Sequence, residues 1–289
     1  MGFRVNTNVD ALKAYQQLAN ANKMTAKAQL RMASGKRILN VADDTSGFNI
    51  GTSLKGKVAV MKGAQGNISS AKNLLSTAEG SLLGVNDLLT KIEGKVSDAT
   101  NPTTDRTSLA NDVKALANEI NSILTSTKFN NTKLLADSDS QKGFLFQVGE
   151  SGDTLKLDFA KSLGSSSGAG ASAAVTAAMA SFTGVSAAVL SSTSGGASTA
   201  ALQTALGSLK SIVSDALGNI GNFSQRLDIK DDTLNVAITN AESTISRLFD
   251  ADMAQEQLNA TKGTILQQSA TAMFSQLNFA PQQVLQLFG

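Results

Sequence analysis

The stretch LKGKVAVMKGAQGNISSAKNLLSTAEGSLLGVNDLLTKIEGKV (Leu54–Val96) decides the fold class, because an apolar residue recurs at every seventh position along it. A second apolar series lies three residues after the first, from Met61 onward, and alternating steps of three and four residues are typical of a coiled-coil seam. The stretch predicts one helix of roughly 65 Å, which we expect to end at Asn101-Pro102 because proline disfavours helix at the residue before it. The two series are Leu54, Met61, Ile68, Leu75, Leu82, Leu89 and Val96, and Ala64, Ala71, Ala78, Val85, Ile92 and Ala99.

The helical period returns in three other parts of the chain. A second helix is predicted over about 105–127, with apolar residues at Leu109, Val113, Leu116, Ile120 and Ile123. A third helix, near the length of the first, is predicted from the series Leu206, Val213, Ile220, Leu227, Leu234, Ala241 and Leu248. The C-terminal stretch keeps a weaker period of seven at Ala251, Leu258, Ile265, Ala272 and Phe279. The N-terminal stretch from about 5 to 32 is amphipathic but rich in Ala and Asn, with Val9 and Leu12 among its few large apolar residues.

Two segments between these helices have a different character. Residues 143–160 (GFLFQVGESGDTLKLDFA) alternate apolar and polar residues around a Gly-containing turn, which predicts a β-hairpin. Residues from Leu163 to Thr199 are dominated by Ser, Ala, Gly and Thr, and we expect them to be either disordered or a small surface excursion. The predicted fold class is therefore mainly α: long coiled-coil helices from both termini packed together, with a small β-hairpin region and a short surface segment.

The composition argues against several classes of function. The chain has neither Cys nor His, which argues against Cys/His zinc sites, thiol catalysis and a Ser-His triad, and no cofactor is expected. A net charge of +2 gives no indication of a nucleic-acid partner. The N-terminus lacks the apolar core of a signal peptide, and no stretch approaches the roughly 18 apolar residues of a membrane span, so no membrane partner is expected.

The stretch VADDTSGFNIG (Val41–Gly51) places two carboxylates beside hydroxyls and glycines, which raises the question of catalysis. An aspartic-protease loop needs flanking strands and a second copy to share the proton, and neither is indicated here. We interpret the stretch as a joint between two helices, in which Asp43, Asp44 and Gly47 shape the chain and Asp44 or Thr45 is the N-cap. Two further carboxylate clusters, Asp231-Asp232 and Asp250-Ala251-Asp252, are interpreted as solvated surface of a long helix. The chain is not expected to be an enzyme.

Several separate motifs resemble those of bacterial flagellin. At the N-terminal side these are RMASGKRILNVADDTSGFNIG (31–51) and TKFNNTKLL (127–135), followed by the hairpin sequence FLFQVGESGDTLKLDF. At the C-terminal side they are RLFDADMAQE (247–256) and ILQQSATAMFSQLNFAPQQVLQLFG (265–289). The motifs occur at both ends of the chain and in the family's order, so the resemblance is specific.

The resemblance implies a structural subunit that polymerises into the filament used for motility. It implies an inner coiled-coil core domain of residues 1–41 and 250–289, an outer helical domain of 42–160 and 199–249, and a short surface segment of 161–198. Its partners would be other copies of the chain, the flagellar cap, the hook-junction proteins and an export chaperone. The chain would be secreted by the flagellar type III route into the extracellular filament. Its expected subunit-interface residues are Val9, Leu12, Leu258, Ile265, Ala272 and Phe279.

One departure from the family concerns the stretch that the flagellin-sensing Toll-like receptor engages. Where many flagellins carry Arg-x-Arg-Glu-Leu, this chain has Thr90, Ile92, Glu93 and Gly94 around Lys91, so the two arginines and the leucine are missing. Since Arg side chains make charge-assisted contacts and often dominate interfaces, weak or no receptor activation is expected. The alternative interpretation is that these positions are simply solvent-facing and free to vary.

Two other functions remain open at this stage. A flagellar hook-filament junction protein would share the flagellin-like termini and the coiled-coil layout. A cytosolic helical signalling rod would share only the long heptad pattern. Filament formation by the purified protein separates both from a flagellin.

Overall fold

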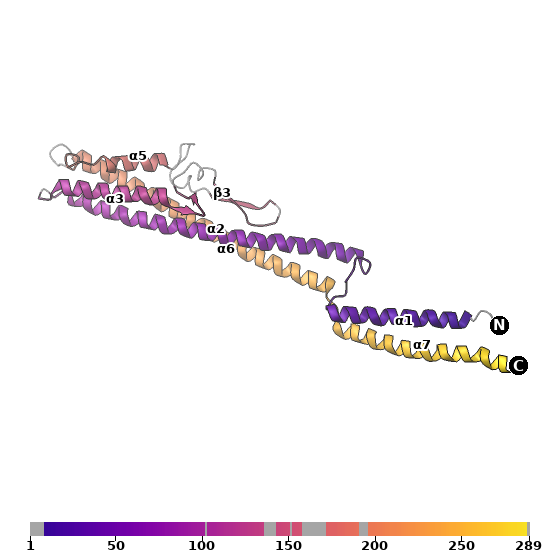
Figure 1. The fold of residues 1–289 in the computed structure, drawn as a ribbon. Helices are drawn as coiled ribbons and strands as arrows, with labels where there is room; N and C mark the ends of the chain where they lie inside the picture. The colour runs from indigo at the N-terminus through magenta and orange to yellow at the C-terminus, as the bar shows by residue number, and fades with distance from the viewer. Residues whose placement is uncertain are drawn as a thin grey trace. The chain divides into compact units, whose positions relative to one another are not determined.

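The computed structural model describes residues 9–101, 103–135, 143–150, 152–157, 172–190 and 196–287. The chain is mainly α-helical, as predicted, with two small antiparallel hairpins. Its helices are α1 (Val9–Ser34), α2 (Thr45–Asp98), α3 (Arg106–Ser126), α5 (Ser172–Thr183), α6 (Gly196–Phe249) and α7 (Met253–Leu287). Its strands are β1 (Lys128–Phe129), β2 (Thr132–Lys133), β3 (Phe144–Gln147) and β4 (Thr154–Leu157) (Figure 1).

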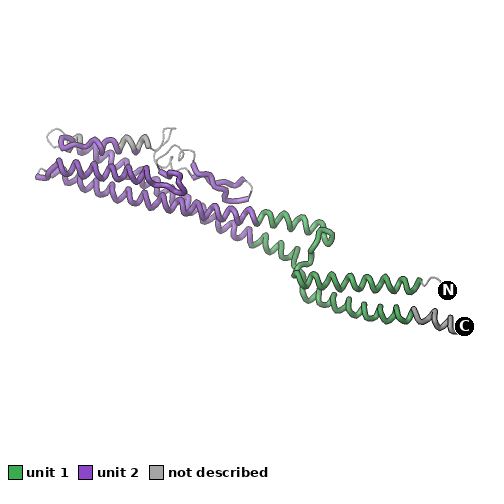
Figure 2. The backbone as a smooth tube through the Cα atoms, in the orientation of Figure 1, with its two compact units in different colours: residues 1–58, 239–289 green, residues 59–238 purple. Residues whose placement is uncertain are grey.

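The chain divides into two compact units (Figure 2). Unit 1 comprises Met1–Val58 and Thr239–Gly289, and unit 2 comprises Ala59–Ile238. Unit 1 is therefore built from both ends of the chain, whereas unit 2 is the continuous stretch between them. These boundaries differ from those of the three-part division implied by the family resemblance, which stays a proposal.

Unit 2 is organised around the antiparallel pair of α2 and α6 (Figure 1). In α2, every member of the two predicted series from Met61 to Ala99 is buried, which confirms the seam. In α6 the predicted series is buried from Leu206 to Leu234, whereas Ala241 and Leu248 are only half-buried. Leu54, the first member of the α2 series, is also only half-buried, so both series are fully buried only within unit 2.

Polar contacts fix the register of α2 against α6 within unit 2. The Gln65 amide donates to Asn235 Oδ1 at 2.7 Å, and Lys72 Nζ lies 2.8 Å from an Asp228 carboxylate oxygen. Further along, Lys210 forms an ion pair with Glu93. Apolar seams tolerate slips of one heptad, so these pairs select one alignment of the two helices.

Helix α3 begins at its N-cap Asp105, whose carboxylate accepts hydrogen bonds from the backbone N–H groups of Thr107 and Ser108. Both ends of α3 lie within one residue of the helix predicted over about 105–127. The buried face includes Ala117 and Leu124, whereas the predicted seam members Leu116 and Ile123 are only half-buried. The burial is displaced because α3 also packs against α5, which the sequence analysis did not predict.

The α5 region lies inside the segment for which disorder or a small surface excursion was expected. Residues 172–190 instead contain a helix and a turn with several buried side chains. These are Val175, Met179, Phe182, Val185 and Leu190. At least this part of the low-complexity segment therefore contributes to the core of unit 2, while residues 158–171 and 191–195 lie outside the described residues.

The predicted hairpin is confirmed by β3 and β4, which pair from Phe144↔Leu157 to Gln147↔Thr154. Lys230 of α6 holds the hairpin turn through Asp153 at 2.6 Å. A second, smaller hairpin of β1 and β2 turns at Asn130 and Asn131, which both have positive φ. Asn tolerates this left-handed backbone better than most residues. Among the described helices, none combines the length and the apolar character that a membrane crossing requires.

Candidate functional site

The paired terminal helices α1 and α7 lie side by side and antiparallel in unit 1 (Figure 1). Apart from Glu256, the buried residues between them are small. They are Ala11, Ala21, Thr25 and Ala28 on α1, and Ala260 and Gly263 on α7. A Cβ atom added at Gly263 would overlap the Thr25 hydroxyl, so glycine is what permits the close approach of the two helices at this level.

Tyr15 of α1 and Phe274 of α7 lie ring to ring at a centroid distance of 6.4 Å, but the large side chains predicted at the interface point away from the contact between the helices. Val9 and Leu12 are 50% and 68% exposed, and Leu258 and Ile265 are 64% and 57% exposed. Ala272 is also exposed, whereas the side chain of Phe279 lies outside the described ones. The period of seven predicted in α7 therefore marks an outward face of this helix pair and not the contact with α1.

A groove of about 700 Å³ runs along one side of the α1–α7 pair. Its apolar lining comes mainly from Met24 of α1 and from Leu266, Met273 and Leu277 of α7. Asp10 and Lys13 are its charged lining residues. Together with the exposed face, the groove leaves much of the apolar surface of this pair without cover from its own chain.

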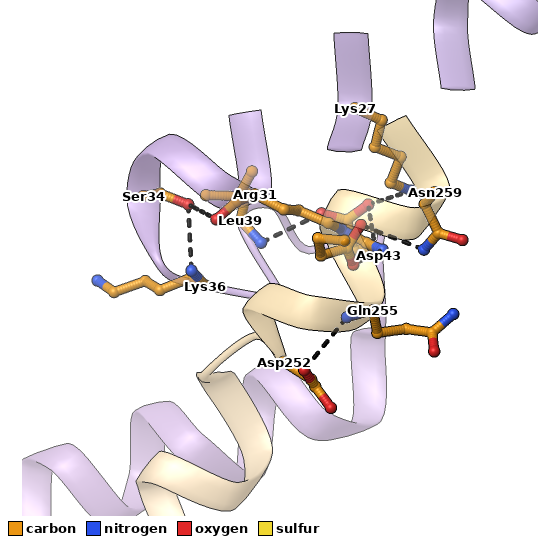
Figure 3. Close-up of polar contacts among 10 residues, drawn as sticks. Lys27, Arg31, Ser34, Lys36, Leu39, Asp43, Asp252, Gln255 and Asn259 are labelled. Atoms are coloured by element: carbon orange, nitrogen blue, oxygen red, sulfur yellow. Dashed lines mark hydrogen bonds and ion pairs between the residues drawn. The ribbon is translucent and has the colours of Figure 1, made fainter. Parts of the chain in front are cut away.

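A cluster of charged side chains holds the pair together at the end where it joins the rest of unit 1 (Figure 3). Arg31 Nη1 of α1 donates to Glu256 Oε1 of α7 at 3.1 Å, and Lys27 Nζ lies 2.6 Å from Asp43 Oδ1. Three of these side chains are largely covered, since Arg31 is 20% exposed, Asp43 12% and Glu256 8%, whereas Lys27 is 52% exposed. The cluster, which we call the joint network, links α1, α7 and the loop that precedes α2.

Asp43 is the most strongly perturbed carboxylate of the joint network. The hydrogen bond from Lys27 and the backbone N–H groups of Leu39 and Asn40, which donate to Asp43 Oδ2, lower its pKa to about 2. The charged carboxylate thereby organises the loop between α1 and α2 around itself. Arg31 Nε is buried without a hydrogen-bond partner, so the joint network is not fully satisfied.

The backbone makes a second connection at the joint. Helix α1 ends at Gly35, whose φ of +66° is the left-handed conformation that glycine adopts readily. The Ala251 N–H then donates to the Gly35 carbonyl at 2.9 Å, and the Arg37 N–H donates to the Phe249 carbonyl at 2.6 Å. Direct backbone hydrogen bonds therefore join the loop between α1 and α2 to the loop between α6 and α7.

The residues singled out in VADDTSGFNIG have structural tasks at this joint. Asp44 is the N-cap of α2, because its carboxylate accepts a hydrogen bond from the Gly47 N–H at 2.9 Å. A side chain at Gly47 would overlap that carboxylate, and one at Gly51 would overlap the ring of Phe249. Phe249 also lies edge-on to Phe48 at a centroid distance of 6.1 Å.

The interpretation of Asp250-Ala251-Asp252 as the surface of one long helix is wrong. The helix stops at Phe249, and Asp252 is the N-cap of the next helix, accepting hydrogen bonds from the Ala254 and Gln255 N–H groups at 2.9 and 3.2 Å. Asp231 is not free surface either, since it lies 3.7 Å from Lys72 Nζ. The residues around Asp250 and Asp252 are all compatible with a helix. Nothing in the local sequence therefore indicates that α6 ends at Phe249.

The joint has four members that were not predicted from the sequence: Lys27, Arg31, Glu256 and Phe249. Arg31 and Glu256 are separated by 225 residues, and no local pattern pairs them. The only available signal was that both lie inside motifs shared with the flagellins.

Of the four residues in the receptor stretch, Thr90, Glu93 and Gly94 are exposed on α2. Ile92 is fully buried, and the interpretation of all four as solvent-facing positions is wrong for this residue. Its position in the second apolar series of the seam explains the burial.

The described residues contain no group of three or more Asp, Glu, Cys or His side chains that could hold a metal ion. The acidic residues whose geometry is given above are engaged in caps and ion pairs.

Comparisons with known proteins agree with this architecture. Residues 5–140 match the family described as "Bacterial flagellin N-terminal helical region", and residues 199–288 match the "Bacterial flagellin C-terminal helical region". The chain is 30% identical to a flagellin of Halalkalibacterium halodurans, with 98% of each chain covered, and 28% identical to a flagellin of Listeria monocytogenes, with 99% of each covered. It is 27% identical to the flagellar filament 33 kDa core protein of Treponema phagedenis, over 98% of this chain and 99% of that one.

Among solved structures, the chain resembles a putative flagellar hook-associated protein of Vibrio parahaemolyticus. The TM-score is 0.55 at 18% identity, covering 72% of this chain and all of the other. This likeness concerns the fold alone, and the family matches do not favour the hook-junction function or the signalling rod. The chain belongs to the bacterial flagellin family and is a structural subunit of the flagellar filament.

Proposed function

We propose that the α1–α7 pair is the element through which copies of this subunit pack on one another in the filament. The observation that carries the proposal is that the pair buries mainly small residues between its helices, whereas the large side chains of Val9, Leu12, Leu258 and Ile265 are exposed. Fully burying a Leu or Ile side chain stabilises by about 1.5–3 kcal/mol, so an interface over this face would be strongly favoured. The interface residues are Val9, Leu12, Leu258, Ile265, Ala272 and Phe279.

A repeated contact of this kind suits a polymer. A surface that packs against a different surface of the next copy produces a helical filament when the rotation between copies does not close a ring. The exposed apolar face and the groove beside it are two such different surfaces on one helix pair. Contiguous exposed apolar surface is also a feature of interaction sites more than of monomeric proteins.

We propose that the joint network keeps α1 and α7 in the register that this interface needs. Arg31 contacts Glu256 of α7, and Lys27 contacts Asp43 of the loop, so one turn of α1 is tied to both. Removing one member would leave a partner charge largely buried without its counter-ion, which is strongly unfavourable. Asp43, Asp44 and Gly47 would then serve as the interdomain joint.

The experiment is to compare Ile265→Asp with Gln267→Asp in a polymerisation assay. Both substitutions add one negative charge at an exposed position of α7, but Gln267 lies about 200° around the helix from Ile265 and so is off the apolar face. Ile265→Asp is expected to block polymerisation while the monomer keeps its helical content, and Gln267→Asp is expected to polymerise. Normal filaments from Ile265→Asp, seen by electron microscopy, would refute the proposed interface.

Membership of the family also supports a proposal about location and partners. We expect the chain to be secreted by the flagellar type III route and to reside in the extracellular filament. Besides itself, its partners would be the flagellar cap, the hook-junction proteins and an export chaperone, with no nucleic acid, membrane or cofactor involved. Loss of the protein from the culture medium of a strain without the flagellar export apparatus would test the route.

We propose in addition that the chain activates the Toll-like receptor for flagellin weakly or not at all. Thr90 and Gly94 are exposed and offer neither a cation nor a large apolar group, and Glu93 is engaged by Lys210. Because Ile92 is buried in the seam, an arginine there would disturb the fold, and the informative variant is Thr90→Arg/Gly94→Leu. A receptor-reporter assay should show a gain of signal for this variant, and strong signalling by the unaltered protein would contradict the proposal.

A further inference from the structure

The glycines within the long helices of this chain fall into two groups. Gly47 and Gly51 of α2 and Gly263 of α7 lie directly against other parts of the chain, where a Cβ atom would overlap a neighbouring side chain. These glycines have a packing reason. The second group has no such reason among the described residues.

The second group lies in the two long helices of unit 2. For each of these glycines, no atom among the described residues, apart from the local helix itself, lies within 4 Å of where a Cβ atom would be. None of them has the positive φ that would require glycine. They are Gly63, Gly66, Gly80, Gly84 and Gly94 of α2, and Gly207, Gly218 and Gly221 of α6; Gly56 of α2, in unit 1, is open in the same way.

A glycine of this kind weakens the helix that contains it. Glycine has the largest backbone entropy in the unfolded chain and loses it on folding, and it adds no side-chain contact in return. Where alanine fits without strain, replacing glycine shifts the unfolding equilibrium towards the folded state by about two- to fivefold per site. Such sites are additive when they lie more than about 10 Å apart.

The packing of the α2–α6 seam does not require glycine at these positions. Its apolar positions in α2 are buried from Met61 to Ala99, and the register is fixed by side chains that are not glycine. The open glycines therefore lower stability without serving the core, and the same fold would accommodate a methyl group at each position.

We infer that the open glycines of α2 and α6 are a built-in device that keeps unit 2 easy to unfold. The inference rests on the proposed secretion of the chain, since a subunit that leaves the cell as an extended polypeptide must first lose the α2–α6 pair. A seam of this length without the glycines would hold the folded state for longer. The device shifts the opening equilibrium of unit 2 towards the open state and leaves the folded architecture unchanged.

The test uses the full-length variant Gly63→Ala/Gly80→Ala/Gly94→Ala. Its three sites are more than about 20 Å apart along α2 at 1.5 Å per residue, so their effects should multiply. The opening equilibrium measured by hydrogen exchange is expected to fall by about 10- to 100-fold, and the melting temperature is expected to rise by about 3–10 °C. The matched control is Glu79→Ala/Lys91→Ala, which places alanine at exposed positions of the same helix, keeps the net charge and is expected to change neither quantity.

The second measurement is the rate at which each variant accumulates outside the cell at equal expression. The triple-alanine variant is expected to accumulate outside the cell more slowly than the wild type and the control. An unchanged melting temperature would overturn the inference, and so would a stabilised variant that is secreted as fast as the wild type. A stabilised variant that is secreted normally but fails to polymerise would assign the glycines to close packing between copies instead. If the wild type itself stayed inside the cell, the proposed secretion would be refuted. The glycines would then have no role in secretion, so the inference would also be refuted, even if the hydrogen-exchange effect were seen.

Discussion

The α2–α6 pair and the α1–α7 pair are both antiparallel helix pairs, yet they bury opposite kinds of residue. In unit 2, the pair buries Leu, Ile and Val between its helices and carries its glycines outside. The terminal pair buries Ala, Thr and Gly between its helices and carries Leu and Ile outside. The first pattern makes a self-sufficient folded element, whereas the second depends on further surfaces to cover its apolar side chains. The difference separates a scaffold from an assembly element within one chain.

The largest effect is expected from truncating the seam of unit 2. Leu82→Ala removes a fully buried side chain and should destabilise the monomer by about 2–5 kcal/mol, because a cavity adds to the lost burial. Leu258→Ala at the exposed face of α7 should change monomer stability by less than about 0.5 kcal/mol. Urea unfolding of the two monomeric variants measures both. Equal destabilisation by the two substitutions would remove the distinction between the pairs.

A smaller effect is expected where the terminal helices touch most closely. Gly263→Ala should weaken the α1–α7 pair by about 1–3 kcal/mol, because the new methyl group overlaps the Thr25 hydroxyl and the helices must separate. The double variant Thr25→Ala/Gly263→Ala removes the overlapping hydroxyl and should recover most of the loss. Thermal unfolding followed by circular dichroism tests the recovery, and a double variant as weak as the single one would show that this overlap is not the cause.

The smallest effect concerns the joint network and acid. The pKa of Asp43 is about 2 in the folded chain against 3.8 for the unperturbed group, so its ionised form is favoured by folding. This contribution to stability is fully present above about pH 4 and is lost as the pH falls through about 2. Asp43→Asn should therefore lower the unfolding temperature at pH 7, and the difference from the wild type should shrink between pH 4 and 2. A difference that stays constant with pH would show that the Asp43 charge is not what stabilises the joint.

The sequence predicted the helices and strands that bury one face along their length. The seam from Met61 to Ala99 and the hairpin of β3 and β4 followed from period alone, because burial on one face imposes that period. Helix α5 was missed because its Ser- and Ala-rich sequence resembles low complexity, and its packing depends on α3. The flagellin family was recognised from motifs at both ends of the chain.

The joint was predicted only in part, for a physical reason. Asp44 could be assigned as a possible N-cap because capping involves neighbours within three residues. The Arg31–Glu256 contact joins residues from opposite ends of the chain, and its existence depends on how α1 and α7 pair. For the same reason, the outward direction of Leu258 and Ile265 required the structure, because a period of seven marks a face but not its partner.

The most direct test of the account is hydrogen exchange of the monomer compared with the filament. Amides of the α2–α6 seam around Leu75 and Leu227 are expected to be protected in both states, since that seam is complete within one chain. Amides of α1 and α7 around Thr25 and Ile265 are expected to exchange rapidly in the monomer and to become protected in the filament. Equal protection of α1 and α7 in the two states would contradict the claim that the terminal pair depends on neighbouring copies for its stability.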